Sequence, residues 1–477
     1  MRRAKIVCTL GPSVANQEAL EKLMQMGMDV ARLNFSHGTH AQHAQTIEWI
    51  RAASIKVRKA VAILGDLQGP KIRTGNLKNG GPVPLKEGSE LVIITDEDYV
   101  GDEKKCSTTY EYLAADVKPG DRILLDDGLL ELKVLETNGK DTVRTQVIVG
   151  GPLGEHKGIN LPGVNLRAEA LTKKDLEDLQ FGLKNGVDYV ALSFVRRPED
   201  IQLARQHMEK FGRRVPIIAK LEKPEALAQL DAIVAATDGV MVARGDLGVE
   251  IPPENVPAIQ KQIVRKCNAR GIPVIVATQM LDSMIRNPRP TRAEASDVAN
   301  AIFDGADAVM LSGESASGKY PFESVQMMHK IVSSAESAID FAKTFAPVHI
   351  VHDGPTPFND VVCEIAVKAA ADAQAAVLCC FTLGGTTARL LSHYRPGMPI
   401  VAFSPNQEVR RRLGLYWGVI PRILEPMEDV EPMVKRVEEE LLARELAKRG
   451  DRLVIVFGTP IGIAGKTNSI RLHQIPA

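Results

Sequence analysis

The stretch Gly239-Val240-Met241-Val242-Ala243-Arg244-Gly245-Asp246 decides the fold, because its short apolar run stops abruptly at charged residues and glycine. Helix signals such as the capping-box pattern Thr172-Lys173-Lys174-Asp175 separate it from similar runs. Near-continuous apolar strands that alternate with helices are typical of parallel strands covered on both faces. Eight such strands predict an α/β fold with a closed (β/α)₈ TIM barrel. The seven other runs lie at residues 5–10, 30–34, 61–66, 189–194, 217–221, 274–278 and 308–311.

The segment between the third and fourth runs has a different sequence pattern from the rest of the chain. It holds short β-rich stretches at 91–95, 122–125, 129–135 and 142–149, separated by Gly, Asp and Asn turns. We interpret Asp126-Asp127-Gly128 as one of these hairpin turns rather than a second metal site. The pattern predicts a small β-barrel domain inserted into a loop at the catalytic end of the main barrel.

The chain therefore divides into three predicted domains. The catalytic barrel takes residues 1–69 and 168–340, and the inserted β domain, a lid, takes 70–167. After residue 340 the alternation resumes around 376–381, 399–403 and 453–457, which predicts a C-terminal α/β regulatory domain at 341–477. The Pro- and Asp-containing segment 347–359 leads into it.

The composition excludes several classes of protein. A chain of 477 residues is too long for one compact core, and its 59 basic residues balance 59 acidic ones. We therefore expect no nucleic acid as the main partner. There is no run of eighteen apolar residues, and the apolar start is too short for a signal peptide, so we expect no membrane association. Six scattered cysteines without a Cys-x-x-Cys pair fit reduced thiols and a cytoplasmic location.

Polar residues follow the apolar runs, where barrel enzymes place their chemistry. Glu222 and Asp246 follow neighbouring runs, and two carboxylates with substrate oxygens are a usual way to hold Mg²⁺. Lys220 is two residues from Glu222, so it can share the same face and stabilise an anion there. Gly245 lets an anionic substrate approach the backbone amides closely.

Two arginines complete this set. Arg32, in the second run, and Arg73, after the third, offer forked donors for phosphate or carboxylate. A metal and cationic clamps, without a covalent nucleophile, are what phosphoryl transfer needs. The chain has no Walker or protein-kinase glycine loop, and the segment 462–467, GIAGKT, lacks the required spacing.

Seven motifs resemble the pyruvate kinase family and occur in the order expected around the insert. The resemblance covers all three predicted domains. It implies transfer of a phosphoryl group from phosphoenolpyruvate to ADP, giving pyruvate and ATP in the last step of glycolysis. It also implies Mg²⁺ as cofactor, with Mn²⁺ as a substitute, and an allosteric homotetramer. The motifs are LNFSHG at 33–38, DLQGPKIR at 66–73, AKLE at 219–222, MVARGDLG at 241–248, ATQM at 277–280, PTRAE at 290–294 and MLSGE at 310–314.

The resemblance assigns roles around the phosphate. Lys220 would stabilise the phosphoryl group in flight, and Arg32 would contact it. Glu222 and Asp246 would hold the Mg²⁺ that bridges the phosphate and the enol oxygen.

Other roles follow from the same resemblance. Gly245 and Asp246, through their backbone, and Thr278, through its side chain, would bind the substrate carboxylate. Arg73 and Lys157 would address the nucleotide phosphates. The proton donor to the enolate is not assigned by the motifs; we expect a water relay near Thr278.

The family's monovalent-cation position shows a departure. Asn34, Ser36, Asp66 and the carbonyl of Leu67 match the K⁺ ligands of K⁺-dependent members, where threonine and glutamate stand at the positions of Leu67 and Lys71. Here Lys71 brings a positive charge in place of a negative one. Such a swap shifts the local potential by about a kcal/mol or more. We expect Lys71 to stand in for the cation and K⁺ not to be required.

The C-terminal domain carries FTLGGTTAR at 381–389 after an apolar run. A strand followed by a Gly/Thr loop and a helix N-terminus forms an anion site from amides and hydroxyls, although such residues are also common loop formers. The stretch resembles the family's sugar-phosphate effector pocket, with residues 462–468 as a second loop. We expect an effector at Thr382, Gly384, Thr386 and Thr387.

Two rival functions remain open at this point. A barrel lyase or a phosphoenolpyruvate mutase would share the Mg²⁺ carboxylates but has no need of Arg73 and Lys157 on an insert. A catalytically inactive sensor of sugar phosphates would be free to lose Lys220 and Glu222. Dependence of turnover on ADP separates these alternatives.

Overall fold

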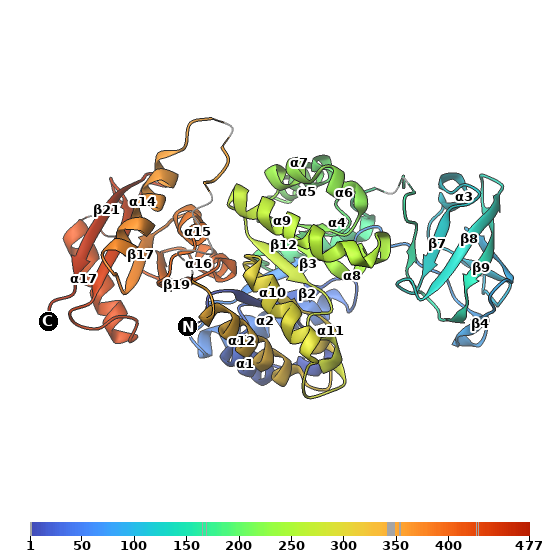
Figure 1. Ribbon diagram of the computed structural model, residues 1–477, viewed down its shortest axis with the longest axis horizontal. Helices are drawn as coiled ribbons and strands as arrows, with labels where there is room; N and C mark the ends of the chain where they lie inside the picture. The colour runs from blue at the N-terminus through green and yellow to red at the C-terminus, as the bar shows by residue number, and fades with distance from the viewer. Residues whose placement is uncertain are drawn as a thin grey trace.

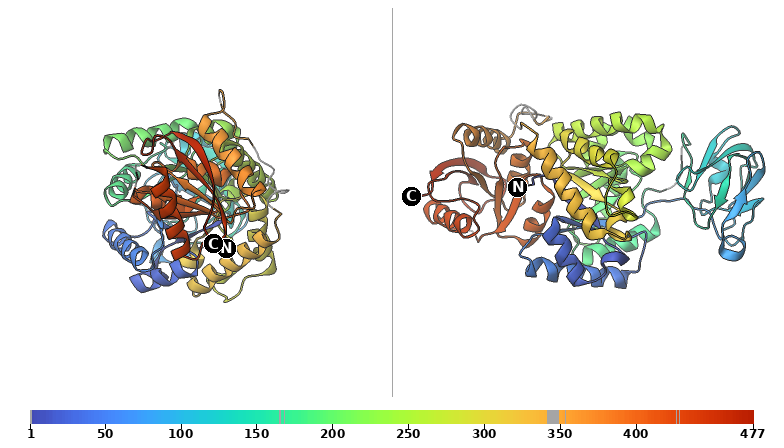
Figure 2. Two further views of the ribbon diagram at one scale, coloured as in Figure 1. Left: turned by 90° about the vertical axis from the view of Figure 1, so that its left-hand side faces the viewer. Right: turned by 60° about the horizontal axis from the view of Figure 1, so that its bottom comes forward.

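Three bodies lie in a row, with the barrel between the C-terminal α/β domain and the inserted β domain (Figure 1). The computed structural model describes residues 2–164, 166–167, 169–340, 349–352, 354–425, 427 and 429–477. The N-terminus lies beside the C-terminal domain (Figure 2), where the Gly418 amide donates to the Arg3 carbonyl at 2.9 Å.

The central body is a closed barrel of parallel strands in the order β1-β16-β15-β14-β13-β12-β3-β2. The predicted TIM barrel is therefore confirmed. Nearly every strand residue is buried, as expected for strands with helices outside and side chains inside. The strands are β1 (Lys5–Thr9), β2 (Val30–Asn34), β3 (Ala62–Asp66), β12 (Tyr189–Leu192), β13 (Ile217–Leu221), β14 (Gly239–Ala243), β15 (Val274–Ala277) and β16 (Ala308–Leu311).

Alternation along each strand decides what faces the barrel interior. Val30, Leu64 and Ile218 belong to the apolar cluster that fills the interior, whereas their sequence neighbours pack outward against the helices. Because side chains alternate with a period of two, Arg32 and Lys220 point inward at the carboxyl end of the barrel.

Two predicted strands continue into residues where the backbone reverses. The run 189–194 ends as a strand at Leu192, and Phe194 has a φ of 54°. The run 274–278 ends at Ala277, and Thr278 has a φ of 71°. In both places the backbone reverses direction, although the sequence pattern predicts that the strand continues. The reversal turns polar groups toward the carboxyl end of the barrel.

Helices cover the outside of the barrel. The capping box predicted at Thr172 and Asp175 begins α4. The helices of this body are α1 (Gln17–Met26), α2 (His40–Lys56), α4 (Lys173–Lys184), α5 (Pro198–Lys210), α6 (Pro224–Ala228), α7 (Leu230–Ala236), α8 (Arg244–Glu250), α9 (Val256–Arg270), α10 (Arg292–Phe303), α11 (Gly313–Ala316) and α12 (Pro321–Ser337). Of these, the short α8 and α11 follow β14 and β16 at the carboxyl end of the barrel.

The inserted body is a β domain, as predicted, with its own apolar core. Its strands form a six-stranded sheet, β11-β7-β8-β9-β5-β6, and a two-stranded sheet, β10-β4. Asp126 and Asp127 have φ angles of 52° and 54° in the turn between β7 and β8, so the hairpin prediction is confirmed. The elements are β4 (Val83–Leu85), β5 (Glu90–Ile94), β6 (Lys105–Ser107), α3 (Leu113–Asp116), β7 (Arg122–Leu125), β8 (Leu130–Thr137), β9 (Thr142–Val149), β10 (Gly151–Leu153) and β11 (Ile159–Asn160).

The C-terminal body is a sheet in the order β19-β18-β17-β20-β21, parallel except for β21. Helices α14 and α15 cover one face, and α17 covers the other. The α/β prediction is confirmed. The elements are α14 (Phe358–Asp372), β17 (Val377–Phe381), α15 (Thr386–His393), β18 (Ile400–Ser404), α16 (Gln407–Arg412), β19 (Val419–Ile423), α17 (Val430–Ala443), β20 (Arg452–Gly458) and β21 (Thr467–Gln474).

Some predicted boundaries fall on residues outside the described ones. These are residue 168, the boundary at 340/341 and part of the segment 347–359. In the described part of the chain, no helix combines the length and the hydropathy that a membrane span requires.

Candidate active site at the carboxyl ends of the barrel strands

A buried group of opposite charges lies at the carboxyl end of the barrel. Lys220 Nζ is 3.0 Å from Glu222 Oε1 and 3.3 Å from Asp66 Oδ1. Arg32 Nε donates to the other oxygen of Asp66 at 2.6 Å, and its Nη1 donates to the Thr9 hydroxyl at 2.9 Å. The predicted Arg32, Asp66, Lys220 and Glu222 are thus brought together.

Ser193 also belongs to this group, and sequence reasoning missed it. Its hydroxyl accepts from Lys220 Nζ at 2.6 Å and donates to the Leu67 carbonyl at 2.7 Å. The next residue, Phe194, donates its amide to Glu222 Oε2 at 2.6 Å. Both contacts depend on the reversal after β12, and the apolar pattern at 189–194 gave no sign of it.

Burial and charge act against each other at these groups. Burial alone would raise the pKa of Asp66, but Lys220 and Arg32 hold that pKa below its ordinary value. Burial would lower the pKa of Lys220, but Asp66 and Glu222 raise it. The lysine therefore stays charged although it is buried, which suits a fixed cation in a water-poor site.

Glu222 and Asp246 form the predicted metal position. Burial raises the pKa of Glu222; the positive charge of Lys220 opposes this shift and the negative charge of Asp246 adds to it. The described residues offer no group of three or more His, Cys, Asp or Glu for a metal. A pair of carboxylates fits Mg²⁺, which usually keeps waters or substrate oxygens as its other ligands.

Thr278 and Gly245 are joined by a hydrogen bond. The Gly245 amide donates to Thr278 Oγ1 at 2.7 Å, and that hydroxyl donates to the Ala277 carbonyl at 2.6 Å. Arg244 holds the same corner by donating to the Thr278 carbonyl at 2.8 Å and pairing with Asp297 at 2.7 Å. Asp246 follows Gly245 in α8. The residues predicted to bind the substrate carboxylate, Gly245, Asp246 and Thr278, therefore lie next to one another.

The predicted monovalent-cation residues are largely engaged by protein groups. Asn34 Oδ1 accepts the Ser36 amide at 3.2 Å, and the Leu67 carbonyl accepts the Ser193 hydroxyl. Asp66 Oδ1 is buried and faces Lys220 Nζ at 3.3 Å. Lys71 pairs instead with Asp246, at 3.7 Å between Nζ and Oδ1.

Arg73 and Lys157 lie on two segments of the insert that are joined by the bridge between Arg73 and Gly158. Arg73 Nη1 donates to the His156 carbonyl at 2.9 Å, and Lys157 Nζ pairs with Asp126 at 2.9 Å. Among the described residues, neither cation pairs with Asp66, Glu222 or Asp246. The structure thus brings the predicted nucleotide residues together on the insert but leaves them apart from the buried group.

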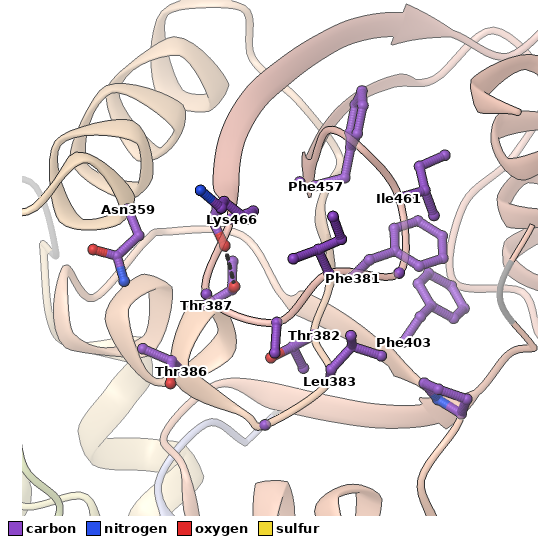
Figure 3. Close-up of a pocket in the computed structure, with 18 of the residues that line it drawn as sticks. Asn359, Phe381, Thr382, Leu383, Thr386, Thr387, Phe403, Phe457, Ile461 and Lys466 are labelled. Atoms are coloured by element: carbon purple, nitrogen blue, oxygen red, sulfur yellow. Dashed lines mark hydrogen bonds between the residues drawn. The ribbon is translucent and has the colours of Figure 1, made fainter. Parts of the chain in front are cut away.

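A separate cavity of about 150 Å³ lies in the C-terminal domain, and the predicted Thr382, Gly384, Thr386 and Thr387 all line it. Thr387 and Thr467 share a hydrogen bond of 2.7 Å between their hydroxyls. Figure 3 shows the polar Asn359, Thr386, Thr387 and Lys466 on one side and the apolar Phe381, Phe403, Phe457 and Ile461 on the other.

Comparison with family models gives two matches. The model of the pyruvate kinase barrel domain matches residues 1–325, and the model of the pyruvate kinase alpha/beta domain matches residues 360–473. Together they span most of the chain.

Known relatives agree with these matches. A pyruvate kinase of Corynebacterium glutamicum is 48% identical over 474 residues, which cover 99% of this chain and 98% of that protein. A pyruvate kinase of Clostridium perfringens is 45% identical over 476 residues, covering 100% of both. The crystal structure of a pyruvate kinase from Cryptosporidium parvum, 39% identical, superposes with a TM-score of 0.93 over 100% of this chain and 96% of that one.

Proposed function

Because the chain belongs to the pyruvate kinase family, we propose that it transfers the phosphoryl group of phosphoenolpyruvate to ADP, giving pyruvate and ATP, the last step of glycolysis. The observation that carries this proposal is the buried Lys220, held between Asp66 and Glu222 at the mouth of the barrel. A preorganised cation beside carboxylates that suit a metal supplies the electrostatic stabilisation that phosphoryl transfer requires.

Lys220 and Arg32 act on the transferring group. The bond between phosphorus and the enol oxygen breaks, and a bond to an oxygen of the ADP β-phosphate forms. The two cations offset the negative charge on the phosphoryl oxygens, and Asp66 already orients both. The enolate that remains takes a proton at C3 from a water relay near Thr278, which gives pyruvate.

Glu222 and Asp246 would hold Mg²⁺, with Mn²⁺ as a substitute. When bound, the ion would offset charge on the substrate phosphate and enol oxygen. The Gly245–Asp246 backbone and the Thr278 hydroxyl would bind the substrate carboxylate. The Gly245 amide and the Thr278 hydroxyl are adjacent, being hydrogen-bonded to each other, and would exchange that contact for contacts with the carboxylate.

Arg73 and Lys157 would bind the ADP phosphates. Lys157 is 40% exposed and pairs with Asp126, so nucleotide phosphates can compete for it. Movement of the insert toward the barrel would bring both cations to the buried group and exclude water from the transfer.

Lys71 replaces the monovalent cation in this proposal. Its ion pair with Asp246 puts a fixed positive charge beside a metal carboxylate. Activity in tetramethylammonium buffer without K⁺ should therefore be close to that in K⁺. Loss of nearly all activity would show that a cation binds at Asn34, Ser36 and Asp66 after all.

The C-terminal cavity would bind a sugar-phosphate activator. Its supports are the threonine hydroxyls that line it and the start of α15 at Thr386. Thr387→Glu places a carboxylate in the cavity and should abolish activation. Gln374→Glu, exposed before β17, is the matched control. Unchanged activation of the Thr387 variant would refute the assignment.

We also propose a cytoplasmic homotetramer that binds neither nucleic acid nor membrane. Sedimentation velocity at assay concentration tests the tetramer, and a stable monomer or dimer would refute it.

The reaction itself is tested by following phosphoenolpyruvate, pyruvate and ATP by ³¹P and ¹H NMR with Mg²⁺. We expect ATP and pyruvate in equal amounts, and no turnover without ADP. Pyruvate without ADP would favour a lyase or phosphatase, and no product with any metal or sugar phosphate would favour a sensor.

A further inference from the structure

A buried carboxylate joins the barrel to the insert. Glu250, at the end of α8, has a side chain that is 1% exposed. Its Oε1 accepts from Lys223 Nζ at 2.5 Å and from Asn160 Nδ2 at 2.8 Å. Lys223 follows β13 in the barrel, whereas Asn160 belongs to β11 of the insert. This oxygen atom therefore bonds to a residue of each body.

Asn160 lies in the ribbon that carries the nucleotide cations. The Ile159 amide donates to the Ile72 carbonyl at 2.9 Å, and the Thr74 amide donates to the Lys157 carbonyl at 2.9 Å. Arg73 is bridged to Gly158 between these bonds. The segments that enter and leave the insert are thus paired, so a displacement of Asn160 is passed on to Lys157 and to Arg73, which is also held by the Thr109 hydroxyl.

Helix α8 carries both Glu250 and Asp246, the carboxylate proposed to bind the metal. Asp246 and Glu250 are four residues apart, one turn along the same side of the helix. Asp246 also pairs with Lys71 of the insert, at 3.7 Å. The helix therefore sets the separation between the metal position and the insert ribbon.

We propose that Glu250 is a positioning residue for the nucleotide: by holding Asn160, it sets the reach of Arg73 and Lys157 toward the buried group. The inference rests on the proposed binding of ADP phosphates by those two cations. A buried, charge-assisted hydrogen bond is short and directional. The bond from Asn160 to Glu250 can therefore act as a fixed point of contact when the insert moves toward the barrel. Displacement of catalytic partners by about 1 Å is enough to cost about a hundredfold in rate.

Asn160→Ala tests the joint, because it removes the bond to the insert and leaves the pair of Lys223 and Glu250 in place. We expect KM for ADP to rise about tenfold while KM for phosphoenolpyruvate stays within about twofold. Asn76→Ala, at an exposed asparagine of the insert, is the matched control and should change neither. Thermal unfolding of each variant shows whether the fold is intact.

A second, double variant distinguishes an effect on the position of Arg73 and Lys157 from an effect on the stability of the fold. Lys223→Met with Glu250→Gln removes the ion pair but keeps an oxygen that can accept from Asn160. We expect its unfolding temperature to change but its KM for ADP to stay within about threefold of wild type. If this variant raises KM for ADP as much as Asn160→Ala does, the joint does not act through the Asn160 bond, and the inference is wrong.

Failure of the inference can be told from failure of the proposed function. Calorimetry should show weaker ADP binding in Arg73→Ala and in Lys157→Ala. If both bind ADP normally, the nucleotide assignment fails and the inference falls with it. If both bind weakly and Asn160→Ala binds normally, only the joint is refuted.

Discussion

Replacing Asp66 with asparagine should strongly destabilise the barrel while changing its shape very little. Asp66 is 1% exposed and faces two cations, Arg32 Nε at 2.6 Å and Lys220 Nζ at 3.3 Å. The asparagine fills the same space but carries no charge, so two cations are left buried with one carboxylate, Glu222, beside them.

The magnitude follows from these distances. At an effective dielectric constant of 20, unit charges 3.3 Å apart attract by about 5 kcal/mol. Part of this is offset because the cations in the variant draw in water or shift. Breaking a buried ion pair by removing one partner costs about 3–5 kcal/mol, and we expect a loss in that range.

Urea unfolding followed by circular dichroism measures the loss. Asp178→Asn is the matched control, because Asp178 is also a buried barrel carboxylate but its partners His40 and Lys174 have side chains 45% and 48% exposed. We expect the control to lose about 1 kcal/mol. Equal losses of unfolding free energy in the two variants would refute the view that Asp66 neutralises the buried cations Arg32 and Lys220.

The same comparison has a pH dependence with a definite sign. The folded pKa of Asp66 is lowered from its ordinary 3.8, so its contribution is present above that pH and is lost as pH falls through the folded pKa. The stability gap between wild type and Asp66→Asn should therefore be constant near neutral pH and shrink below about pH 4. A gap that grows on acidification would contradict the assignment.

Two further predictions concern the substrate corner and the thiols. Thr278→Val removes the acceptor of the Gly245 amide and should raise KM for phosphoenolpyruvate about tenfold in steady-state assays, whereas Thr278→Ser should stay near wild type; equal effects of the two would contradict this. All six cysteines are buried, and burial raises the pKa of Cys106 to about 12, so a disulfide reagent such as DTNB should leave the native chain unmodified and label six thiols in urea. Rapid labelling of the native protein would contradict the burial.

Most of the fold could be predicted, because strands buried on both faces leave a strong apolar signature. The eight runs became eight strands, and the hairpin at Asp126 and Asp127 lies where its turn residues indicate. The strand ends at Leu192 and Ala277 were missed for a physical reason. An apolar residue such as Phe194 packs equally well in a strand or in a left-handed turn.

Part of the candidate site could also be predicted from the sequence. The position of Arg32, Lys220 and Glu222 at or just after strand ends indicated a charged site, whereas Asp66 was expected, by resemblance, among the ligands of a monovalent cation. The structure brings all four residues together. Ser193 was missed because a single serine in an apolar run carries no signal of its own. The bond from Asn160 to Glu250 joins residues 90 apart in sequence, and pairing over that distance cannot be read from local pattern.

The most direct test of the account compares wild type with Lys220→Met in a pyruvate-release assay with Mg²⁺ and ADP. Lys210→Met, exposed in the last turn of α5, is the control for loss of a lysine. We expect rapid ADP-dependent turnover in wild type and control, and a loss of at least about a thousandfold in kcat in the Lys220 variant, with the fold retained. A folded Lys220→Met protein that turns over within about tenfold of wild type would contradict the claim that this buried cation stabilises the transferring phosphoryl group.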